Sequence, residues 1–427
     1  MYMKRPLYLA ALLLSSAALQ AQTLDYCRRL AREHYPEIRQ YELVSLTEEY
    51  NISNAKRAWI PQVVFSGQAT YQSATPTYPE AFSSLLKAHG IENVGIRKDQ
   101  YKLALDINQN IWDGGVSQAQ TAVAKSEAEE KRRSLDVSLY EVESRVDNLY
   151  FGILLLDEQV AQVKSKIALL DSNLDKMRAY YNNGVAMQSD VDAVEVERIA
   201  AGQTLEQIKA SREGYRRMLE LFIGQPLVDE KLQRPVLDVP ADRLSARPEL
   251  ALFDARIEKL QAQKKSVNTS VMPRFNAFAQ GFYGYPGLDM FKSMTSTDWT
   301  LNGIVGVRMS WNIGAFYTQK NNLQTLDAAA RSVAVQRDVF LFNTDLQLTQ
   351  EDSEIARLRK AIVDDERIVA LRRSVRQAAE VQMENGVIDT TDLLRKITDE
   401  TRASLARSVH EIELLQAICR MKHTLNQ

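Results

Sequence analysis

Two long stretches of the sequence, residues 116–183 and 315–385, contain no proline and are rich in Ala, Leu, Glu, Lys, Arg and Gln. The second stretch also lacks glycine, and the first has only Gly152. Such composition favours helix, and a helix of about 70 residues would be roughly 100 Å long. Because a single globular core does not use helices of this length, the pattern predicts a coiled coil or a helical tube. Apolar residues at spacings of three and four predict one buried stripe on the first helix: Leu135, Leu139, Val142, Val146, Leu149 and Ile153.

Four shorter segments, 62–71, 102–111, 274–283 and 305–311, alternate between apolar and polar residues. This period of two predicts strands with one apolar face, and runs of about 9–12 residues match tilted membrane-spanning strands. The four tryptophans, at 59, 112, 299 and 311, lie in or beside these segments. The alternative is a soluble sheet, which would leave its edges exposed. The smallest membrane barrels need about eight strands, so closure requires several chains, and three chains would supply twelve.

The sequence contains an internal repeat. Pro36 and Pro248 each precede a segment of helical composition that ends at a second proline 25 residues later, Pro61 or Pro273. An alternating segment, a long helix, an Asn-Gly-Val turn and a further helix follow in both halves. The expected organisation is a first repeat over 22–225, a linker over 226–247, and a second repeat over 248–427.

The first 21 residues are expected to be a secretory signal peptide. Lys4 and Arg5 precede an apolar run over residues 7–19, and a small residue, Ala21, offers a cleavage site before Gln22. The run is too short to cross a membrane as a retained helix. The mature chain is therefore predicted to leave the cytoplasm.

Composition and candidate chemistry argue against an enzyme. The 427 residues include 53 basic and 55 acidic side chains, a balance that disfavours a nucleic-acid partner. The four histidines are scattered without metal-ligand spacing, so no metal, cofactor or catalytic residue is predicted. Cys27 and Cys419 leave two possibilities open, a disulfide or two buried thiols.

The order of these elements, together with several motifs, resembles the TolC family of outer-membrane efflux proteins. The first-half motifs are His34-Tyr35-Pro36-Glu37, Trp59-Ile60-Pro61, Ile111-Trp112-Asp113-Gly114-Gly115 and Tyr181-Asn182-Asn183-Gly184-Val185. The second-half counterparts are Arg247-Pro248-Glu249, Met272-Pro273, Trp311-Asn312-Ile313-Gly314 and Glu384-Asn385-Gly386-Val387. The resemblance implies a mainly α, TolC-like fold with membrane β-strands. It implies a homotrimer with a 12-stranded barrel in the outer membrane of a Gram-negative cell, continued by a helical tube across the periplasm. The linker over 226–247 would then help to form a belt around the tube.

The two Asn-Gly-Val turns carry the candidate site residues. Glycine suits a left-handed helix C-cap, and Ser189-Asp190 and Thr391-Asp392 are expected to supply N-cap chemistry for the returning helices. The resemblance implies that the turns form the periplasmic tip, which binds an adaptor protein, and that the position of Asp392 lines the channel constriction. A well-known family member has a second Asp one turn later; this sequence has Arg395, which predicts an Asp392–Arg395 ion pair. The candidate constriction residues are Asp190, Asp392 and Arg395, and the candidate tip residues are Asn183, Gly184, Val185, Asn385, Gly386 and Val387.

The function that the resemblance implies is a passive outer-membrane conduit of a tripartite efflux system. Such a channel works with a periplasmic adaptor (membrane fusion) protein and an inner-membrane pump, and exports drugs, metals or other toxic small molecules. A channel for type I protein secretion would share every feature described above, because partners choose the cargo. A periplasmic helical structural protein would explain the helices but not the four strands flanked by tryptophan.

Overall fold

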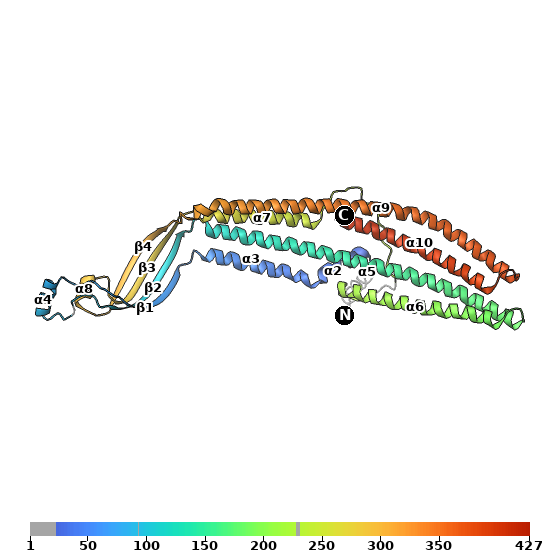
Figure 1. The fold of residues 1–427 in the computed structure, drawn as a ribbon, viewed down its shortest axis with the longest axis horizontal. Coiled ribbons are helices and arrows are strands. Elements are labelled where there is room, and N and C mark those ends of the chain that lie inside the picture. The colour runs from blue at the N-terminus through green and yellow to red at the C-terminus, as the bar shows by residue number, and fades with distance from the viewer. Residues whose placement is uncertain (1–22, 93, 228–230) are drawn as a thin grey trace, which may run out of the picture. The chain divides into compact units, whose positions relative to one another are not determined.

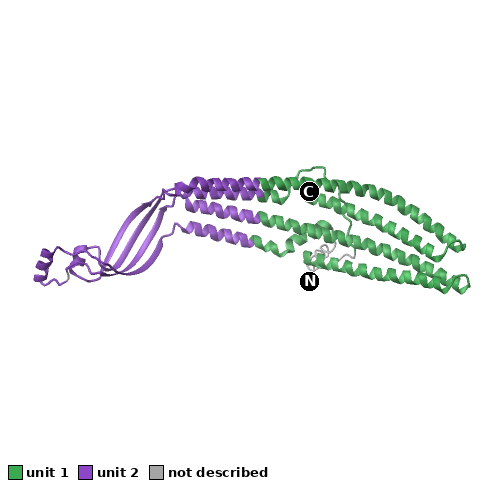
Figure 2. Cartoon of the chain, viewed as in Figure 1, with its two compact units in different colours: residues 1–41, 133–252, 335–427 green, residues 42–132, 253–334 purple. Residues whose placement is uncertain are grey.

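The structure is a computed structural model that describes residues 23–92, 94–227 and 231–427. The predicted signal peptide, residues 1–21, lies outside this range. The chain divides into two compact units, each built from separated segments (Figure 2). Unit 1 contains residues 1–41, 133–252 and 335–427, and unit 2 contains residues 42–132 and 253–334.

Unit 2 contains a four-stranded antiparallel sheet in the order β1-β2-β3-β4 (Figure 1). The strands are β1 Gln62–Tyr71, β2 Asp99–Trp112, β3 Arg274–Tyr285 and β4 Thr300–Ser310. All four predicted strands are confirmed, although β4 ends one residue before Trp311. Short helices interrupt the two loops between paired strands, α4 Glu80–Ala88 and α8 Met290–Thr295. Neither short helix was predicted.

The helical part of unit 2 consists of most of α3, Gln40–Arg57, and α7, Pro248–Thr269, with the first parts of α5 and α9. Ion pairs join these helices. Glu48 of α3 pairs with Arg132 of α5 at 2.5 Å, and Lys259 of α7 pairs with Glu130 of α5 at 2.5 Å.

Unit 1 is built from two long helical hairpins and a short N-terminal helix. The helices are α2 Leu24–His34, the 3₁₀ helix η2 Pro36–Arg39, α5 Val116–Asn182, α6 Gln188–Ile223, α9 Ala315–Glu384 and α10 Thr390–Leu425. The predicted long helices over 116–183 and 315–385 are therefore confirmed within one residue at each end. The mainly α fold with a four-stranded sheet is that of the sequence prediction.

The predicted apolar stripe of α5 forms the main core of unit 1. Leu139, Val146 and Ile153 are fully buried, and only Leu149 of the six predicted residues stays partly exposed. Apolar residues of α2, α6 and α10 pack against the part of the stripe around Val146. A second core lies toward the turns, where Leu174 of α5, Val194 of α6, Met383 of α9 and Ile397 of α10 meet.

The described residues between α6 and α7 form neither helix nor strand, but they are tied to unit 1. The Tyr150 hydroxyl donates to the Gln233 carbonyl at 2.6 Å, and Arg243 pairs with Asp352 of α9 at 2.9 Å. Leu237 packs against the main core and against a third cluster, in which Leu358 of α9 meets Met421 of α10. That this segment helps to form a belt around a tube stays a prediction.

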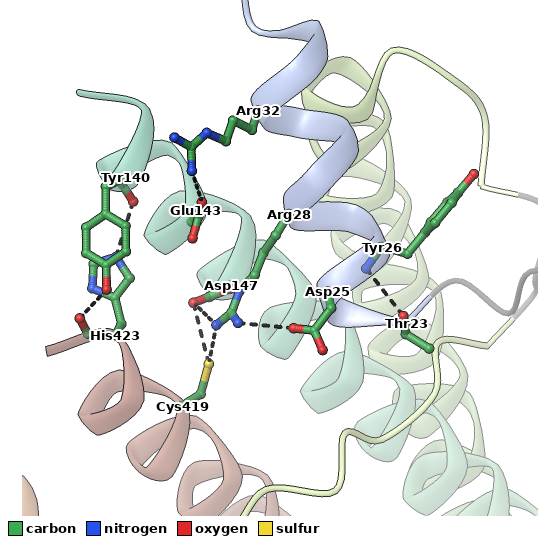
Figure 3. Close-up of polar contacts among 10 residues, drawn as sticks. All are labelled: Thr23, Asp25, Tyr26, Arg28, Arg32, Tyr140, Glu143, Asp147, Cys419 and His423. Carbon is green, nitrogen blue, oxygen red and sulfur yellow. Dashed lines mark hydrogen bonds and ion pairs between the residues drawn. The ribbon is translucent and has the colours of Figure 1, made fainter. Parts of the chain in front are cut away.

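A polar cluster joins α2 to α5 and α10 (Figure 3). Arg28 donates to both carboxylate oxygens of Asp147 at 2.7 Å, and its Nη2 lies 3.0 Å from Cys419 Sγ. Both cysteines are free and buried. Burial raises the pKa of each thiol to about 12, so both are neutral thiols at physiological pH.

The ring of His423 stacks on Tyr140 beside this cluster, with centroids 4.1 Å apart (Figure 3). His423 Nε2 lies 3.2 Å from the Tyr140 carbonyl oxygen, and the Tyr140 hydroxyl donates to the His423 carbonyl. Burial lowers the pKa of His423. The C-terminal turn of α10 is therefore fixed to α5 by a neutral imidazole.

Candidate functional site

The two Asn-Gly-Val turns have the same geometry. Gly184 and Gly386 adopt φ of 75° and 71°, the left-handed region that a side chain disfavours. The glycine N–H donates three residues back and the following valine N–H donates five residues back in both turns, at 2.8–3.0 Å. These two hydrogen bonds satisfy carbonyl groups at the helix end that would otherwise lack a partner within the helix. A Cβ at either glycine would meet no atom within 4 Å, so the turns present open backbone.

Both turns lie at the same end of unit 1, as Figure 1 shows. Lys176 of α5 pairs with Glu384 of α9 at 2.8 Å, and the Thr390 hydroxyl contacts Met177 Sδ at 3.5 Å. The valines of the turns, Val185 and Val387, stay largely exposed, at 77% and 69%. The structure thus brings the six predicted tip residues together at one end.

The starts of the returning helices correct the predicted caps. The N-cap residues are Met187 and Asp389. Of the predicted capping pairs, Ser189-Asp190 and Thr391-Asp392, only Asp190 makes a capping hydrogen bond with its side chain. Asp190 stands at the third helical position and accepts from the Met187 N–H at 2.9 Å. Asp389 accepts from the Asp392 N–H at 2.7 Å, which leaves the carboxylate of Asp392 for another partner. The predicted N-caps were two residues too late, because several adjacent polar residues can cap a helix. The backbone conformation determines where the helix begins and so which residue is the N-cap.

That partner is Arg395, whose Nη1 lies 3.6 Å from Asp392 Oδ1. The side chains are 65% and 46% exposed for Arg395 and Asp392, so the predicted ion pair is present but solvated. A groove between α6 and α10 runs past Arg395, and its apolar lining includes Val196 and Leu394. The charged groups that line this groove are Asp192, Glu197, Arg395, Asp399 and Arg402.

Sequence reasoning missed four of these five charged groove residues, Asp192, Glu197, Asp399 and Arg402. On α10 the spacing is visible in retrospect, since 391, 395, 398, 399 and 402 lie on one face of the helix. Which face of α6 they meet depends on how the hairpins pair, which spacing alone does not determine. Asp190, which was predicted with Asp392, lies at the cap while Asp192 lines the groove.

Behind the groove, α9 and α10 are joined by a half-buried ion network. Glu400 pairs with Arg376 and, at 3.2 Å, with Arg373. Arg376 also pairs with Glu380 at 2.6 Å. A buried pair that loses one partner leaves an uncompensated charge, so this network fixes the register of the second hairpin.

The sheet of unit 2 has two chemically distinct faces. Residues paired in register share a face, and one face carries Val63, Phe65, Leu103, Leu105, Tyr283, Val305, Val307 and Met309. Most of these apolar side chains are exposed. The only charged residue on this face is Asp99 at the start of β2, which pairs with Arg97 at 2.7 Å.

The opposite face of the sheet is polar. It carries four charged groups, Lys102, Asp106, Arg274 and Arg308, together with amides and hydroxyls. Apolar residues interrupt this face at Val64, Ala104, Phe278, Phe282 and Ile304. Each of the two phenylalanine rings lies against a cation, Arg308 or Lys102. A sheet with an exposed apolar face and a polar opposite face is typical of strands between lipid and water.

Aromatic groups gather at both ends of the sheet. At the loop end, Trp299 stacks on Tyr101 with centroids 6.1 Å apart and lies 5.4 Å from Tyr283. At the helix end, Trp112 packs on Phe275 at 5.9 Å, and Trp311 Nε1 donates to the Val271 carbonyl at 2.9 Å. Tyrosine and tryptophan prefer the two membrane–water interfaces.

Within the described residues, no group of three His, Cys, Asp or Glu side chains is arranged to hold a metal ion.

None of the helices in the described parts of the chain has an apolar stretch long enough to cross a membrane.

Comparison with known proteins shows which family model the sequence matches and which solved structures share the fold. Residues 27–225 match the family model of the outer membrane efflux protein. No protein of curated function matches the sequence. Among solved structures, the outer membrane protein VceC of Vibrio cholerae is similar, with a TM-score of 0.68 and 15% identity over 94% of this chain and 95% of that one.

Two further channels have the same fold. The outer-membrane channel OprN gives a TM-score of 0.67 at 16% identity, over 94% of this chain and 89% of its own. The open-state MtrE channel of Neisseria gonorrhoeae gives 0.64 at 14% identity, over 94% of this chain and 88% of its own.

Proposed function

Because this chain is an outer membrane efflux protein of the TolC family, by its matched segment 27–225 and by its fold, we propose that three copies form a passive conduit of a tripartite efflux system. The conduit carries small toxic molecules from a periplasmic adaptor and inner-membrane pump to the exterior. The observation that carries the proposal is the two-faced sheet with unpaired edges.

The sheet has open edges because its order ends in β1 on one side and β4 on the other. An edge strand presents unpaired N–H and C=O groups, and in lipid each unsatisfied group costs several kcal/mol. If β4 of one chain pairs with β1 of the next, three chains close a twelve-stranded ring. Its apolar face then meets lipid and its polar face lines the lumen.

The part of α9 in unit 1 supports the same assembly. A stripe of apolar side chains at spacings of four, three and four is exposed: Val335 at 60%, Val339 at 53%, Phe342 at 64% and Leu346 at 55%. No element of the described chain covers this stripe. A helix of a second copy is the expected occupant, because the same chains must already meet at the strand edges.

The paired turns support docking of an adaptor. Open backbone at Gly184 and Gly386 and exposed valines beside them allow another helical hairpin to approach closely. We place the adaptor site at the six turn residues and the constriction at Asp392 and Arg395, with Asp190 acting as a capping group.

The first test is assembly. The full-length protein should fractionate with the outer membrane, and light scattering of the detergent-extracted protein should give the mass of a trimer. A monomer in the soluble periplasmic fraction would refute the proposal.

The second test separates small-molecule export from protein secretion. A strain that lacks the chain should become more sensitive to drugs or toxic metals, and plasmid expression should restore resistance. Secreted protein in the medium is measured in parallel. Unchanged sensitivity together with loss of one secreted protein would favour the type I secretion channel instead.

A further inference from the structure

The charged groups on the polar face of the sheet are unequal in sign. β1 contributes none, β2 contributes Lys102 and Asp106, β3 contributes Arg274, and β4 contributes Arg308. Three basic groups and one acidic group give this face two net positive charges per chain.

The single acid is engaged within the face. Lys102 Nζ donates to Gln280 Oε1 at 2.8 Å, and Gln280 Nε2 in turn donates to Asp106. Lys102 Nζ also lies 4.4 Å from the centre of the Phe282 ring. Lys102 and Asp106 are thus bridged through one amide, and their charges offset one another.

The two arginines lie nearer the helix end of the sheet and lack such compensation. Arg274 opposes Ser310, and Arg308 opposes Asn276, so the arginines are diagonal neighbours about 7–8 Å apart along the strands. Both are exposed, and neither has a carboxylate partner among the described residues. The Arg308 guanidinium lies 4.8 Å from the centre of the Phe278 ring, which holds it on this face.

We propose that Arg274 and Arg308, the arginine pair, form an anion-attracting belt on the channel wall, so that the conduit favours solutes bearing carboxylate, sulfate or phosphate groups. This inference rests on the proposed trimer, in which three arginine pairs line one ring of the lumen. Rings of Arg or Lys select anions in other pores. Guanidinium groups also bind carboxylate and phosphate oxygens in pairs.

Electrostatic screening sets the reach of the belt. The Debye length is about 8 Å at 0.15 M salt and about 3 Å at 1 M. Charges on the wall of a wide lumen therefore influence permeating ions strongly only at low ionic strength. Like charges on diagonal neighbours repel one another, and an anion bound between the two guanidinium groups relieves that repulsion.

The experiment uses the full-length trimer in planar lipid bilayers. Reversal potentials under a KCl gradient give the chloride-to-potassium permeability ratio, first at about 0.1 M and then at about 1 M salt. The R274Q/R308Q variant should lower this ratio at low salt, and the difference from wild type should shrink at high salt. The R274K/R308K variant, which keeps both charges, should remain close to wild type.

Block by inositol hexakisphosphate localises the effect. Added from the side of the sheet, this polyanion should block wild type and R274K/R308K, and R274Q/R308Q should need about tenfold more. K292Q removes a positive charge in the β3–β4 loop and should leave block unchanged. If the trimer conducts but R274Q/R308Q matches wild type in both measurements, the belt is refuted and the conduit stands. If the protein forms no channel at all, the proposed function fails first.

Discussion

The long helices α5 and α9 have nearly equal lengths and corresponding places in the two halves, yet they are buried very differently in unit 1. The apolar stripe of α5 is covered by α2, α6, α10 and the segment before α7. The apolar stripe of α9, from Val335 to Leu346, faces solvent in the single chain. The same periodicity is buried within the chain in α5, and in α9 it forms the surface that we propose is buried between chains.

The difference is informative because a folded monomer rarely leaves such a stripe exposed without a partner. α5 carries the stability of the unit, and α9 carries the surface that proposed neighbouring copies would cover. Substitutions on the two stripes should consequently fail in different ways.

The largest effect is expected from charges placed in the two stripes. Val339→Asp with Phe342→Asp on α9 should abolish the trimer and leave a helical monomer, because the charges block association without entering a core. Val146→Asp on α5 should instead unfold unit 1, since an unpaired buried charge costs more than about 4 kcal/mol. Light scattering and circular dichroism measure the two outcomes. A trimeric α9 variant would show that this stripe is not the contact between chains.

A bulky charge at the turns should stop transport without disturbing assembly. Gly184→Arg after α5 and Gly386→Arg after α9 place a long side chain where the adaptor is proposed to approach, and drug resistance should fall to the level of the deletion strain. Gly→Ala at each position is the control, because it adds the same backbone strain, about 1 kcal/mol, without the bulk. Equal loss of resistance in the alanine variants would assign the effect to a strained cap, and full resistance in the arginine variants would exclude docking there.

A moderate effect of pH is expected where α10 packs on α5. Burial, the largest cause, holds the pKa of His423 below its ordinary value of about 6.5, and Arg247 and Arg28 lower it further while Asp147 opposes them. The unfolded chain therefore binds a proton more readily, so stability is full above about pH 6.5 and falls as pH decreases toward the folded pKa. The loss should be on the order of 1 kcal/mol. Chemical denaturation at pH 7.5 and 5.5 should show a smaller decrease for His423→Gln than for wild type; equal decreases would show that His423 does not contribute.

The smallest effect is expected at the exposed Asp392–Arg395 pair. Such a pair contributes only about 0–1 kcal/mol, so unfolding should hardly change. Arg395→Asp should increase channel block by divalent cations added from the side of the turns, and Asp392→Ala should reduce it. Asp190, at the corresponding place after α5, serves as the comparison, because Asp190→Asn should leave block unchanged. If none of these variants alters conductance or block, the pair does not line the constriction.

The elements that repeat or alternate could be predicted from the sequence, because local composition decides them. Residues 116–182 and 315–384 contain no proline and only one glycine, Gly152, so the bounds of both helices were predicted within one residue. The four strands alternate regularly and were all found, although β4 begins five residues before the predicted start at 305. The short helices α4 and α8 were missed, since their few apolar residues carry no long period. The residue that precedes α4 is Pro79, and in the sequence alone a proline there indicates only a turn.

Contacts between distant segments could not be predicted. Arg28 meets Asp147 and Cys419, which are 119 and 391 residues away. The groove lined by Asp192 and Arg402 likewise exists only after the two hairpins have paired. The caps at Met187 and Asp389 were displaced by two residues, because neighbouring polar residues compete for the same backbone groups.

The unpaired edges of β1 and β4 have a consequence for the genetics of defective variants of this chain. Two joined copies would still have one unpaired strand edge at each end. A partial ring would therefore pair with further strands as readily as a single chain does, and only closure of the ring would remove the unpaired edges. A variant in which one edge strand cannot pair would still join a partial ring through its intact edge strand and would then prevent the ring from closing. Such an allele should act dominantly, because it sequesters normal copies in leaky assemblies rather than merely failing to contribute.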